Sequence, residues 1–300
     1  MKVRRDSNGV HVFDRRSGLN ILLDEIDIPP HERAWAPRFV SIALTNACDL
    51  HCRFCYAPKH VARLDVDAVV AWAIELDEGG CLGLGLGGGE PTLHPDFPEL
   101  CQRVAAETQL SVSFTTHGHR ITDQVVEQLG GSVHFVRVSM DGVGATYERI
   151  RGRSFAAFLH KLTLVRSIAP FGINFVVNTG TVGELDDAAA LAVEHGAFEM
   201  LLLPERPVAG SGGIDSASSR ALTRWIRDNA EHRLALSDTA PTDGIPIANP
   251  FRDGSGVSAY AHIDASGRLR RSSFSMEGVH VRSSVRAALE ELLNRTGETV

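Results

Sequence analysis

Three of the five cysteines lie within eight residues of each other, in the stretch "NACDLHCRFCYAPKH". Cys48, Cys52 and Cys55 follow the spacing Cys-x3-Cys-x2-Cys. Thiolates so close together on one loop usually bind a metal, and three of them suit a cubane iron–sulfur cluster with one iron left open for chemistry. Structural zinc is an alternative, but it prefers four ligands and would need His51 or His60 as well. A thioredoxin-like redox pair, the other alternative, needs only two cysteines.

Length and composition are those of an ordinary soluble globular protein of 300 residues. The formal net charge of -7 argues against a non-specific nucleic-acid surface, which would be basic. We find no run of apolar residues long enough to span a membrane and no apolar signal core after the basic N-terminus. The cysteines are odd in number and three of them are clustered, which does not resemble a secreted disulfide framework. We therefore expect a cytoplasmic protein without membrane or nucleic-acid partners.

From residue 39 onward, strands and helices are expected to alternate. A strand–helix alternation predicts a parallel sheet with right-handed crossovers, and six such units are too few for a closed eight-fold barrel. The predicted fold is therefore α/β, with a partial (β/α)6 TIM-like barrel. Functional residues of such a fold belong at the carboxyl ends of the strands, and the cysteine loop directly follows the first strand. The expected strands are 39–45, 81–88, 110–116, 133–142, 172–179 and 199–205, and the expected helices are 65–80, 96–107, 121–131, 155–169 and 184–197.

Two smaller regions are expected to flank the barrel of residues 39–205. Residues 1–38 contain a hairpin in "GVHVFDRRSGLNILLDE" and a proline-containing linker. Residues 206–300 are predicted to form an α+β extension. Its expected parts are a Gly/Ser-rich loop (208–219), a helix (220–233), a turn-rich stretch (236–256), a hairpin (258–275) and a final helix (284–295).

The cysteine spacing, with Phe54 before the third cysteine, resembles the motif of the radical S-adenosylmethionine (SAM) superfamily. The resemblance implies that the three cysteines hold a [4Fe-4S] cluster and that SAM binds at its open iron. "GGGEP" follows the second expected strand and is similar to the Gly-Gly-Glu segment with which the family binds the amino group of SAM. Glycines allow close backbone approach and the Glu90 carboxylate can pair with an ammonium group, although a plain turn is the alternative.

Further segments extend the resemblance to peptide- and sulfatase-maturing members. "SMDG", followed by "YERIRG", looks like a run whose serine lies near the ribose and carboxylate end of SAM; Arg151 would hold that carboxylate, and Arg153 competes for this role. In "FTTHGHR" His117 stands where relatives have asparagine, as a titratable imidazole in the cavity or as a structural histidine with its hydrogen bonds satisfied. Leu203 and Pro204 are expected near the adenine. The implied cofactor-binding set is Phe54, Tyr56, Gly88, Gly89, Glu90, Thr116, Ser139, Asp141, Arg151, Asn178 and Leu203.

"HIDASGRLRRSSFS" resembles the segment that opens the auxiliary-cluster (SPASM/twitch) domain of many peptide-modifying members. Here Ser272 stands where a cysteine would be, and no cysteine follows Cys101. The resemblance therefore implies an extension that lacks the auxiliary cluster. The two remaining thiols, Cys81 and Cys101, are expected to be buried parts of the core.

The resemblance implies reductive cleavage of SAM to a 5′-deoxyadenosyl radical, which abstracts a hydrogen atom from the substrate. The expected substrate is a ribosomally made precursor peptide that is cross-linked, epimerised or oxidised. The N-terminal hairpin could offer an edge strand to its leader. A small metabolite (a sugar, nucleoside or amino acid) is the alternative substrate, and a non-catalytic iron–sulfur or zinc protein is the alternative from another class. A flavodoxin or ferredoxin is the expected reductant.

Overall fold

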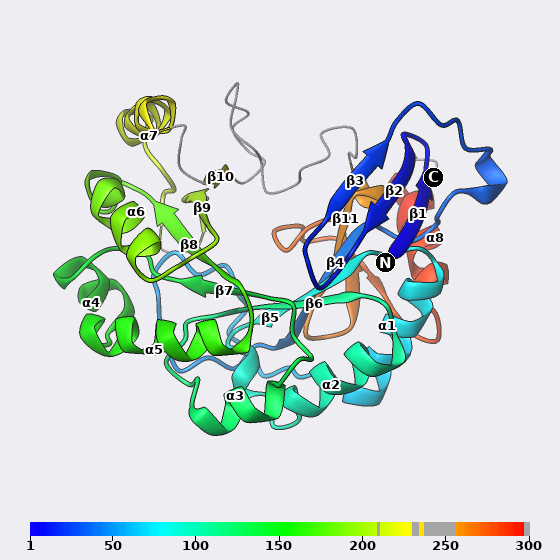
Figure 1. The fold of residues 1–300 in the computed structure, drawn as a ribbon, viewed down its shortest axis with the longest axis horizontal. Helices are drawn as coiled ribbons and strands as arrows, with labels where there is room; N and C mark the ends of the chain where they lie inside the picture. The colour runs from blue at the N-terminus through cyan, green and yellow to red at the C-terminus, as the bar shows by residue number, and fades with distance from the viewer. Residues whose placement is uncertain (209–210, 230–233, 237–255, 297–300) are drawn as a thin grey trace.

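The computed structural model describes residues 1–208, 211–229, 234–236 and 256–296 (Figure 1). Six parallel strands form its centre, as predicted, and the helices run along the outer side of the curved sheet (Figure 1). Apolar side chains on the face of the sheet that these helices cover, such as Val40, Ile42 and Leu84, are completely buried. The strands are β4 (Phe39–Thr45), β5 (Gly83–Gly88), β6 (Ser111–Thr116), β7 (Phe135–Ser139), β8 (Phe171–Val177) and β9 (Glu199–Pro204).

The expected barrel helices are confirmed, with one addition. A short helix, α4, occupies the stretch after "SMDG" and carries Arg151 at its last position. The helices are α1 (Val66–Glu78), α2 (Phe97–Glu107), α3 (Asp123–Leu129), α4 (Ala145–Arg151), α5 (Phe155–Ile168) and α6 (Leu185–Glu194). Short 3-10 turns lie at Pro30–Glu32, Pro91–Leu93, Val182–Glu184 and Gly256–Ser258.

The main sheet continues beyond the six barrel strands. The expected C-terminal hairpin is confirmed as β11 (Tyr260–Ile263) and β12 (Arg268–Arg270). β11 pairs in parallel with β4, so the hairpin extends the barrel sheet. The sheet order is β10-β9-β8-β7-β6-β5-β4-β11-β12-β13, where β10 is Leu234–Leu236 and β13 is Val279–His280.

The C-terminal helices differ slightly from expectation. α7 (Ser216–Asp228) begins inside the stretch expected to be a loop, because the Asp215 carboxylate caps it by accepting the N–H groups of Ala217 and Ser218. The residues 230–233, which were expected to end this helix, and most of the turn-rich stretch lie outside the described residues. α8 (Val285–Thr296) agrees with the predicted final helix. Within the described part of the chain, no helix combines the length and apolar character needed to cross a membrane.

A separate three-stranded antiparallel sheet precedes the barrel. The predicted hairpin is confirmed as β2 (Gly9–Phe13) and β3 (Asn20–Leu23), and a third strand, β1 (Lys2–Asp6), was not expected. Its inner face is polar: the Arg4 side chain is 1% exposed and donates to the carbonyls of Ala36 (2.8 Å) and Gly80 (3.0 Å). These bonds hold β1 to the start of the barrel. Because the buried face of β1 is charged rather than apolar, its sequence lacks the alternating pattern that predicts a strand.

Candidate active site

The three clustered cysteines lie on the loop that leaves the carboxyl end of β4. None of them forms a disulfide, and each sulfur accepts a hydrogen bond from one N–H donor. The Cys48 sulfur accepts from the Leu50 amide (3.4 Å), Cys52 from Arg151 (3.3 Å) and Cys55 from Lys59 (3.4 Å). Burial raises the pKa of the Cys48 thiol, and the Leu50 N–H opposes that rise. Two cationic donors and one amide donor suit sulfurs that carry negative charge.

Two glycines pack the end of β5 against the start of this loop. Gly88 has a φ of +119°, and a Cβ built on it would lie 2.2 Å from the Thr45 carbonyl oxygen. A Cβ on Gly89 would lie equally close to the Ala47 carbonyl oxygen. The Gly89 and Glu90 amides donate to the carbonyls of Thr45 (2.7 Å) and Ala47 (2.8 Å). Only glycine fits these positions, so the segment "GGGEP" fixes the backbone from which the cysteine loop departs.

The Glu90 carboxylate is 1% exposed and receives donors on both oxygens. One oxygen accepts from the hydroxyls of Thr92 (2.7 Å) and Thr116 (2.8 Å) and from the Thr92 amide (3.3 Å). The other oxygen accepts from the His117 amide (2.9 Å) and lies 3.3 Å from the His117 ring nitrogen Nε2. The carboxylate is therefore held in one orientation by residues that follow β5 and by residues at the end of β6.

Arg151 is the arginine of "YERIRG" that points into the site. Its guanidinium forms an ion pair with Asp141, donates to the Cys52 sulfur, and lies 5.9 Å from the centre of the Phe54 ring. Asp141, which has a φ of 30°, is buried and also accepts the Val176 amide (2.6 Å). The competing arginine, Arg153, is 44% exposed and contacts Asp49 instead. The structure thus places Arg151 against a cysteine sulfur and joins it, through Asp141, to the carboxyl ends of β7 and β8, whereas Arg153 meets the cysteine loop at Asp49.

His117 has its hydrogen bonds satisfied, as in the second alternative considered for it. Its Nδ1 accepts the His119 amide (3.1 Å), so Nε2 carries the proton and donates to the Asp49 carboxylate (2.8 Å). Burial alone would raise the pKa of Asp49, but the hydrogen bond from His117 and the nearby cations lower it below its usual value. Asp49 directly follows Cys48, so this pair ties the cysteine loop to the end of β6.

Cys48, Asp49 and His117 also form a group that could ligate a metal ion. One ligand atom each from Cys48, Asp49 and His117 lies within 4.8 Å of the others. His51 and His60, the histidines considered as completing a zinc site, are both exposed, and His60 lies 3.3 Å from the Asn46 side chain.

Three other predicted residues lie at strand ends farther along the sheet. Ser139 ends β7 and Leu203 lies in β9, and both side chains are half-buried. The Asn178 amide donates to the Glu205 carboxylate (2.5 Å) and its oxygen accepts the Gly180 amide (2.8 Å). These contacts hold the turn after β8 in place. None of the contacts found for these three residues within the described chain reaches the cysteine loop.

An aromatic contact joins the cysteine loop to the C-terminal extension, which the sequence alone did not indicate. The centre of the Tyr56 ring, which is predicted to contact SAM, lies 4.6 Å from the centre of the Phe274 ring. The Arg206 guanidinium lies 4.4 Å from the centre of the same Phe274 ring. Arg206 follows β9 and Phe274 follows β12, so segments from distant strands of the sheet meet here. Arg206 belongs to no motif, and Asp49 and Phe274 stand at positions that the motif segments around them leave open, so only the fold reveals their contacts at the site.

The two remaining thiols are completely buried, as expected. Cys81 lies just before β5, and Cys101 lies in α2 and faces the core. Burial raises the pKa of both thiols above its usual value. Both lie away from the carboxyl edge of the sheet, where the clustered cysteines are found.

Comparison with known proteins relates the chain to one superfamily. A family model described as the Radical SAM superfamily matches residues 42–192. Mycofactocin maturase MftC of Mycobacterium ulcerans is 34% identical over 173 residues, which cover 54% of this chain and 46% of that protein. AdoMet-dependent heme synthase of Methanosarcina barkeri is 29% identical over 217 residues, covering 68% of this chain and 62% of that protein. The chain thus spans about half the length of the MftC proteins that it matches.

A solved structure shares the fold. The Streptococcus suis protein SuiB, bound to its precursor peptide SuiA, superposes with a TM-score of 0.74 at 14% sequence identity. The match covers 96% of this chain and 86% of SuiB. At such low identity the likeness concerns the fold alone, and it confirms the partial barrel.

Proposed function

The chain belongs to the radical SAM superfamily, and from this we propose that it is an enzyme that modifies a ribosomally synthesised precursor peptide. The family uses a [4Fe-4S] cluster and SAM. The observation that carries the proposal is the loop of three free thiols at the carboxyl edge of the sheet, each with an N–H donor, beside Glu90 and Arg151.

The residues of this loop fit an iron–sulfur cluster. Cys48, Cys52 and Cys55 would ligate three irons, and the N–H donors on their sulfurs stabilise the thiolate form. When bound, the cluster and SAM supply a radical able to abstract hydrogen from an unreactive C–H bond. The chain supplies the position of the reacting groups and excludes water from them. We expect a flavodoxin or ferredoxin to deliver the electron.

Glu90 and Arg151 would hold the two ends of the amino-acid part of SAM. The Glu90 carboxylate already receives donors from Thr92, Thr116 and His117, so the ammonium group would replace one of them. Arg151 carries a positive charge beside Cys52 and would pair with the SAM carboxylate once its ion pair with Asp141 is shared. The remaining proposed contacts are those of Phe54, Tyr56, Gly88, Gly89, Thr116, Ser139, Asp141, Asn178 and Leu203.

The choice of a peptide as substrate is supported by the names of relatives. Mycofactocin maturase MftC acts in maturation, and SuiB has been solved with a precursor peptide. A small-molecule substrate is the second candidate, because the chain also matches a heme synthase over 68% of its length. We also propose that residues 1–38, 39–205 and 206–300 are its three structural regions, and that the last of them binds no second cluster.

The test is SAM cleavage by the purified protein. Anaerobically reconstituted protein, reduced with dithionite, should convert SAM into methionine and 5′-deoxyadenosine. The matched control replaces Cys48, Cys52 and Cys55 together by alanine and should lose all iron, because each of the three proposed ligands is gone. If the reconstituted wild type forms no 5′-deoxyadenosine, the non-catalytic alternative is correct.

The substrate class is then tested with a synthetic peptide. Where a short open reading frame lies beside this gene, the peptide that it encodes should change in mass when incubated with SAM, dithionite and the enzyme. Continued 5′-deoxyadenosine formation with an unchanged peptide would contradict a peptide substrate and favour the small-molecule candidate.

A further inference from the structure

The N-terminal sheet has charged and polar side chains buried on its inner face and, apart from Arg5, apolar side chains on its outer face. Lys2, Arg4 and His11 are buried against the barrel. On the opposite face the pairing register aligns Val3, Val12 and Ile21 across the three strands. Val3 is 57% exposed and Ile21 is 42% exposed. An apolar row that continues to the edge of a sheet marks an interaction surface.

The edge of this sheet at β3 is open. The Asp14 amide donates to the Leu19 carbonyl (2.9 Å), so by the alternation of an antiparallel pair the backbone groups of Leu19, Ile21 and Leu23 point toward β2. Those of Asn20 and Leu22 therefore point outward. Among the described residues, no backbone hydrogen bond from another element reaches this edge. The opposite edge, β1, is partly covered, because the Arg5 carbonyl accepts the Ala34 amide (2.9 Å).

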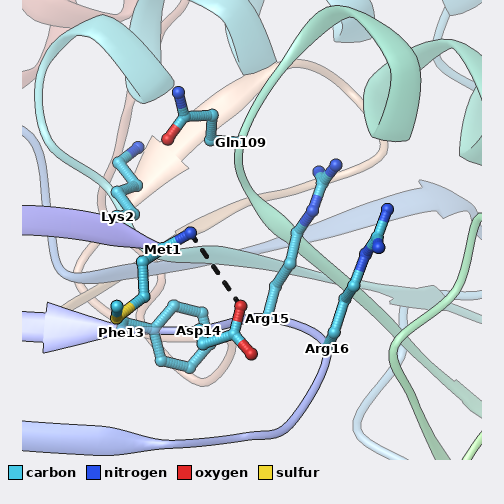
Figure 2. A pocket seen from close by; sticks show the side chains of 7 residues that line it. All are labelled: Met1, Lys2, Phe13, Asp14, Arg15, Arg16 and Gln109. Atoms are coloured by element: carbon cyan, nitrogen blue, oxygen red, sulfur yellow. Dashed lines mark ion pairs between the residues drawn. The ribbon is translucent and has the colours of Figure 1, made fainter.

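On the exposed face, the apolar side chains along and just before β3 are arranged symmetrically about Ile21. Leu19 and Leu23 flank it at equal distances on the exposed face, and they are 46% and 45% exposed. A positive charge, Arg16, precedes this row, and two exposed carboxylates, Asp24 and Glu25, follow it. Figure 2 shows Arg15 and Arg16 side by side, and both line a cavity whose volume is about 360 Å³. Arg15 donates to the last carbonyls of α2, whereas no ion pair of Arg16, Asp24 or Glu25 is found in the described chain.

We propose that β3 pairs with β3 of a second copy of this chain, antiparallel, about a two-fold axis at Ile21. Antiparallel pairing in this register sets Ile21 opposite its own copy, Leu19 opposite Leu23, and Asn20 opposite Leu22. The outward backbone groups of Asn20 and Leu22 then complete a six-stranded sheet. Each Arg16 end meets the partner's Asp24 and Glu25 end. A symmetric apolar row with opposite charges at its ends fits a second copy better than a peptide of unrelated sequence.

The oligomeric state tests this proposal. Cluster-loaded protein should show a reversible, concentration-dependent dimer in anaerobic sedimentation velocity, in the micromolar range because the contact is small. Added salt should weaken it. Ile21→Lys should abolish the dimer, since it places two like charges opposite each other on the axis. The control Val3→Lys adds the same charge to the same face on the other edge strand and should leave the dimer intact.

Cross-linking tests the register. Ile21→Cys should form a disulfide-linked dimer in an oxidised glutathione buffer, whereas Leu22→Cys should not. In the proposed register the two copies of residue 22 are diagonal neighbours, about 7–8 Å apart, beyond the usual reach of a disulfide. The wild type, treated in parallel, accounts for the native thiols.

Three results would overturn the proposal: a monomer at every concentration, a dimer that survives Ile21→Lys, or a monomer whose binding of the synthetic precursor peptide is lost in Ile21→Lys. The last result would assign the edge to the peptide. SAM cleavage by Ile21→Lys should stay at the wild-type rate, which shows that the variant is folded and separates this proposal from the proposed function.

Discussion

At the residue scale, the site is built from side chains that each serve two partners. His117 contacts both Asp49, next to the first cysteine, and Glu90, the proposed ligand of the SAM amino group. Arg151 contacts both Asp141 and Cys52. A change at one of these residues therefore reaches the cysteine loop and the proposed SAM site together. Glu90 is different, because within the described chain the hydrogen bonds of its carboxylate come from Thr92, Thr116 and His117 and none comes from a cysteine.

We therefore expect Glu90→Gln to weaken SAM binding and to leave the cluster in place. Losing a charge-assisted hydrogen bond in a buried site costs about 1.5–3 kcal/mol, or roughly one to two decades in affinity. Equilibrium dialysis would give the affinity, and iron content and absorption spectra would report the cluster. An unchanged affinity with full iron content would mean that "GGGEP" only forms a turn.

At the element scale, the close contact between the end of β5 and the cysteine loop limits what the sequence can be. A Cβ at Gly88 meets the Thr45 carbonyl oxygen at 2.2 Å, whereas a Cβ at the preceding Gly87 has no atom within 4 Å. Both glycines belong to the same motif and look equivalent in the sequence. The structure predicts that Gly88 does not tolerate a side chain, whereas Gly87 does.

Gly88→Ala should destabilise the protein by about 2–5 kcal/mol, since it combines a strained backbone with a clash against a main-chain carbonyl. Gly87→Ala is the matched control and should behave as the wild type. Urea unfolding and iron incorporation measure the two effects. Equal behaviour of the two variants would contradict the packing described for β5.

The pairing of β11 with β4 gives a second prediction at this scale. His262 in β11 is buried, and its Nδ1 lies 2.7 Å from the Ser41 hydroxyl oxygen in β4. Burial, aided by the charge of Arg270 and opposed by that of Asp264, lowers the pKa of His262 to about 4. The unfolded chain therefore binds a proton between about pH 4 and 6.5 that the folded chain does not bind. The stability contribution is complete above pH 6.5 and is lost as the pH falls toward 4.

His262→Gln should accordingly flatten the pH dependence of unfolding. Between about pH 4 and 6.5, the slope of unfolding free energy against pH should fall by up to ~1.4 kcal/mol per pH unit, the value for one proton. Urea unfolding of cluster-free protein at several pH values measures it. His160→Gln, at an exposed position, is the control, and an equal change in both variants would rule out His262 as the source.

At the scale of the whole molecule, local sequence patterns predicted the barrel but not the pairing of its first strand with the C-terminal extension. Apolar runs such as "FVSIALT" and the spacing of three cysteines are local, so the strand order and the cysteine loop could be predicted. The parallel pairing of β11 with β4 joins residues more than 200 positions apart, and nothing in either strand indicates the other. The contact between His117 and Asp49 was missed for the same reason. β1 was missed because its buried face carries Lys2 and Arg4.

One long-range contact fixes the C-terminal helix to the barrel. The Glu75 carboxylate in α1 accepts the Ser284 hydroxyl (2.5 Å) and the amides of Val285 (2.7 Å) and Arg286 (3.1 Å) at the start of α8. A helix N-terminus leaves amides without partners in the helix, and a carboxylate satisfies them. In this molecule that cap comes from a helix 209–211 positions earlier in the chain.

We expect Glu75→Ala to lower the unfolding free energy by about 1–2 kcal/mol, the usual cost of losing a helix cap. Because α8 packs against α1, β12 and β13, its loosening should be detected first in these elements. Hydrogen exchange should therefore increase in α8 and in β12, while β6 and β7 stay protected. Glu78→Ala removes an exposed carboxylate from the same helix and is the control. Uniform exchange in both variants would show that Glu75 does not hold the C-terminal extension on the barrel.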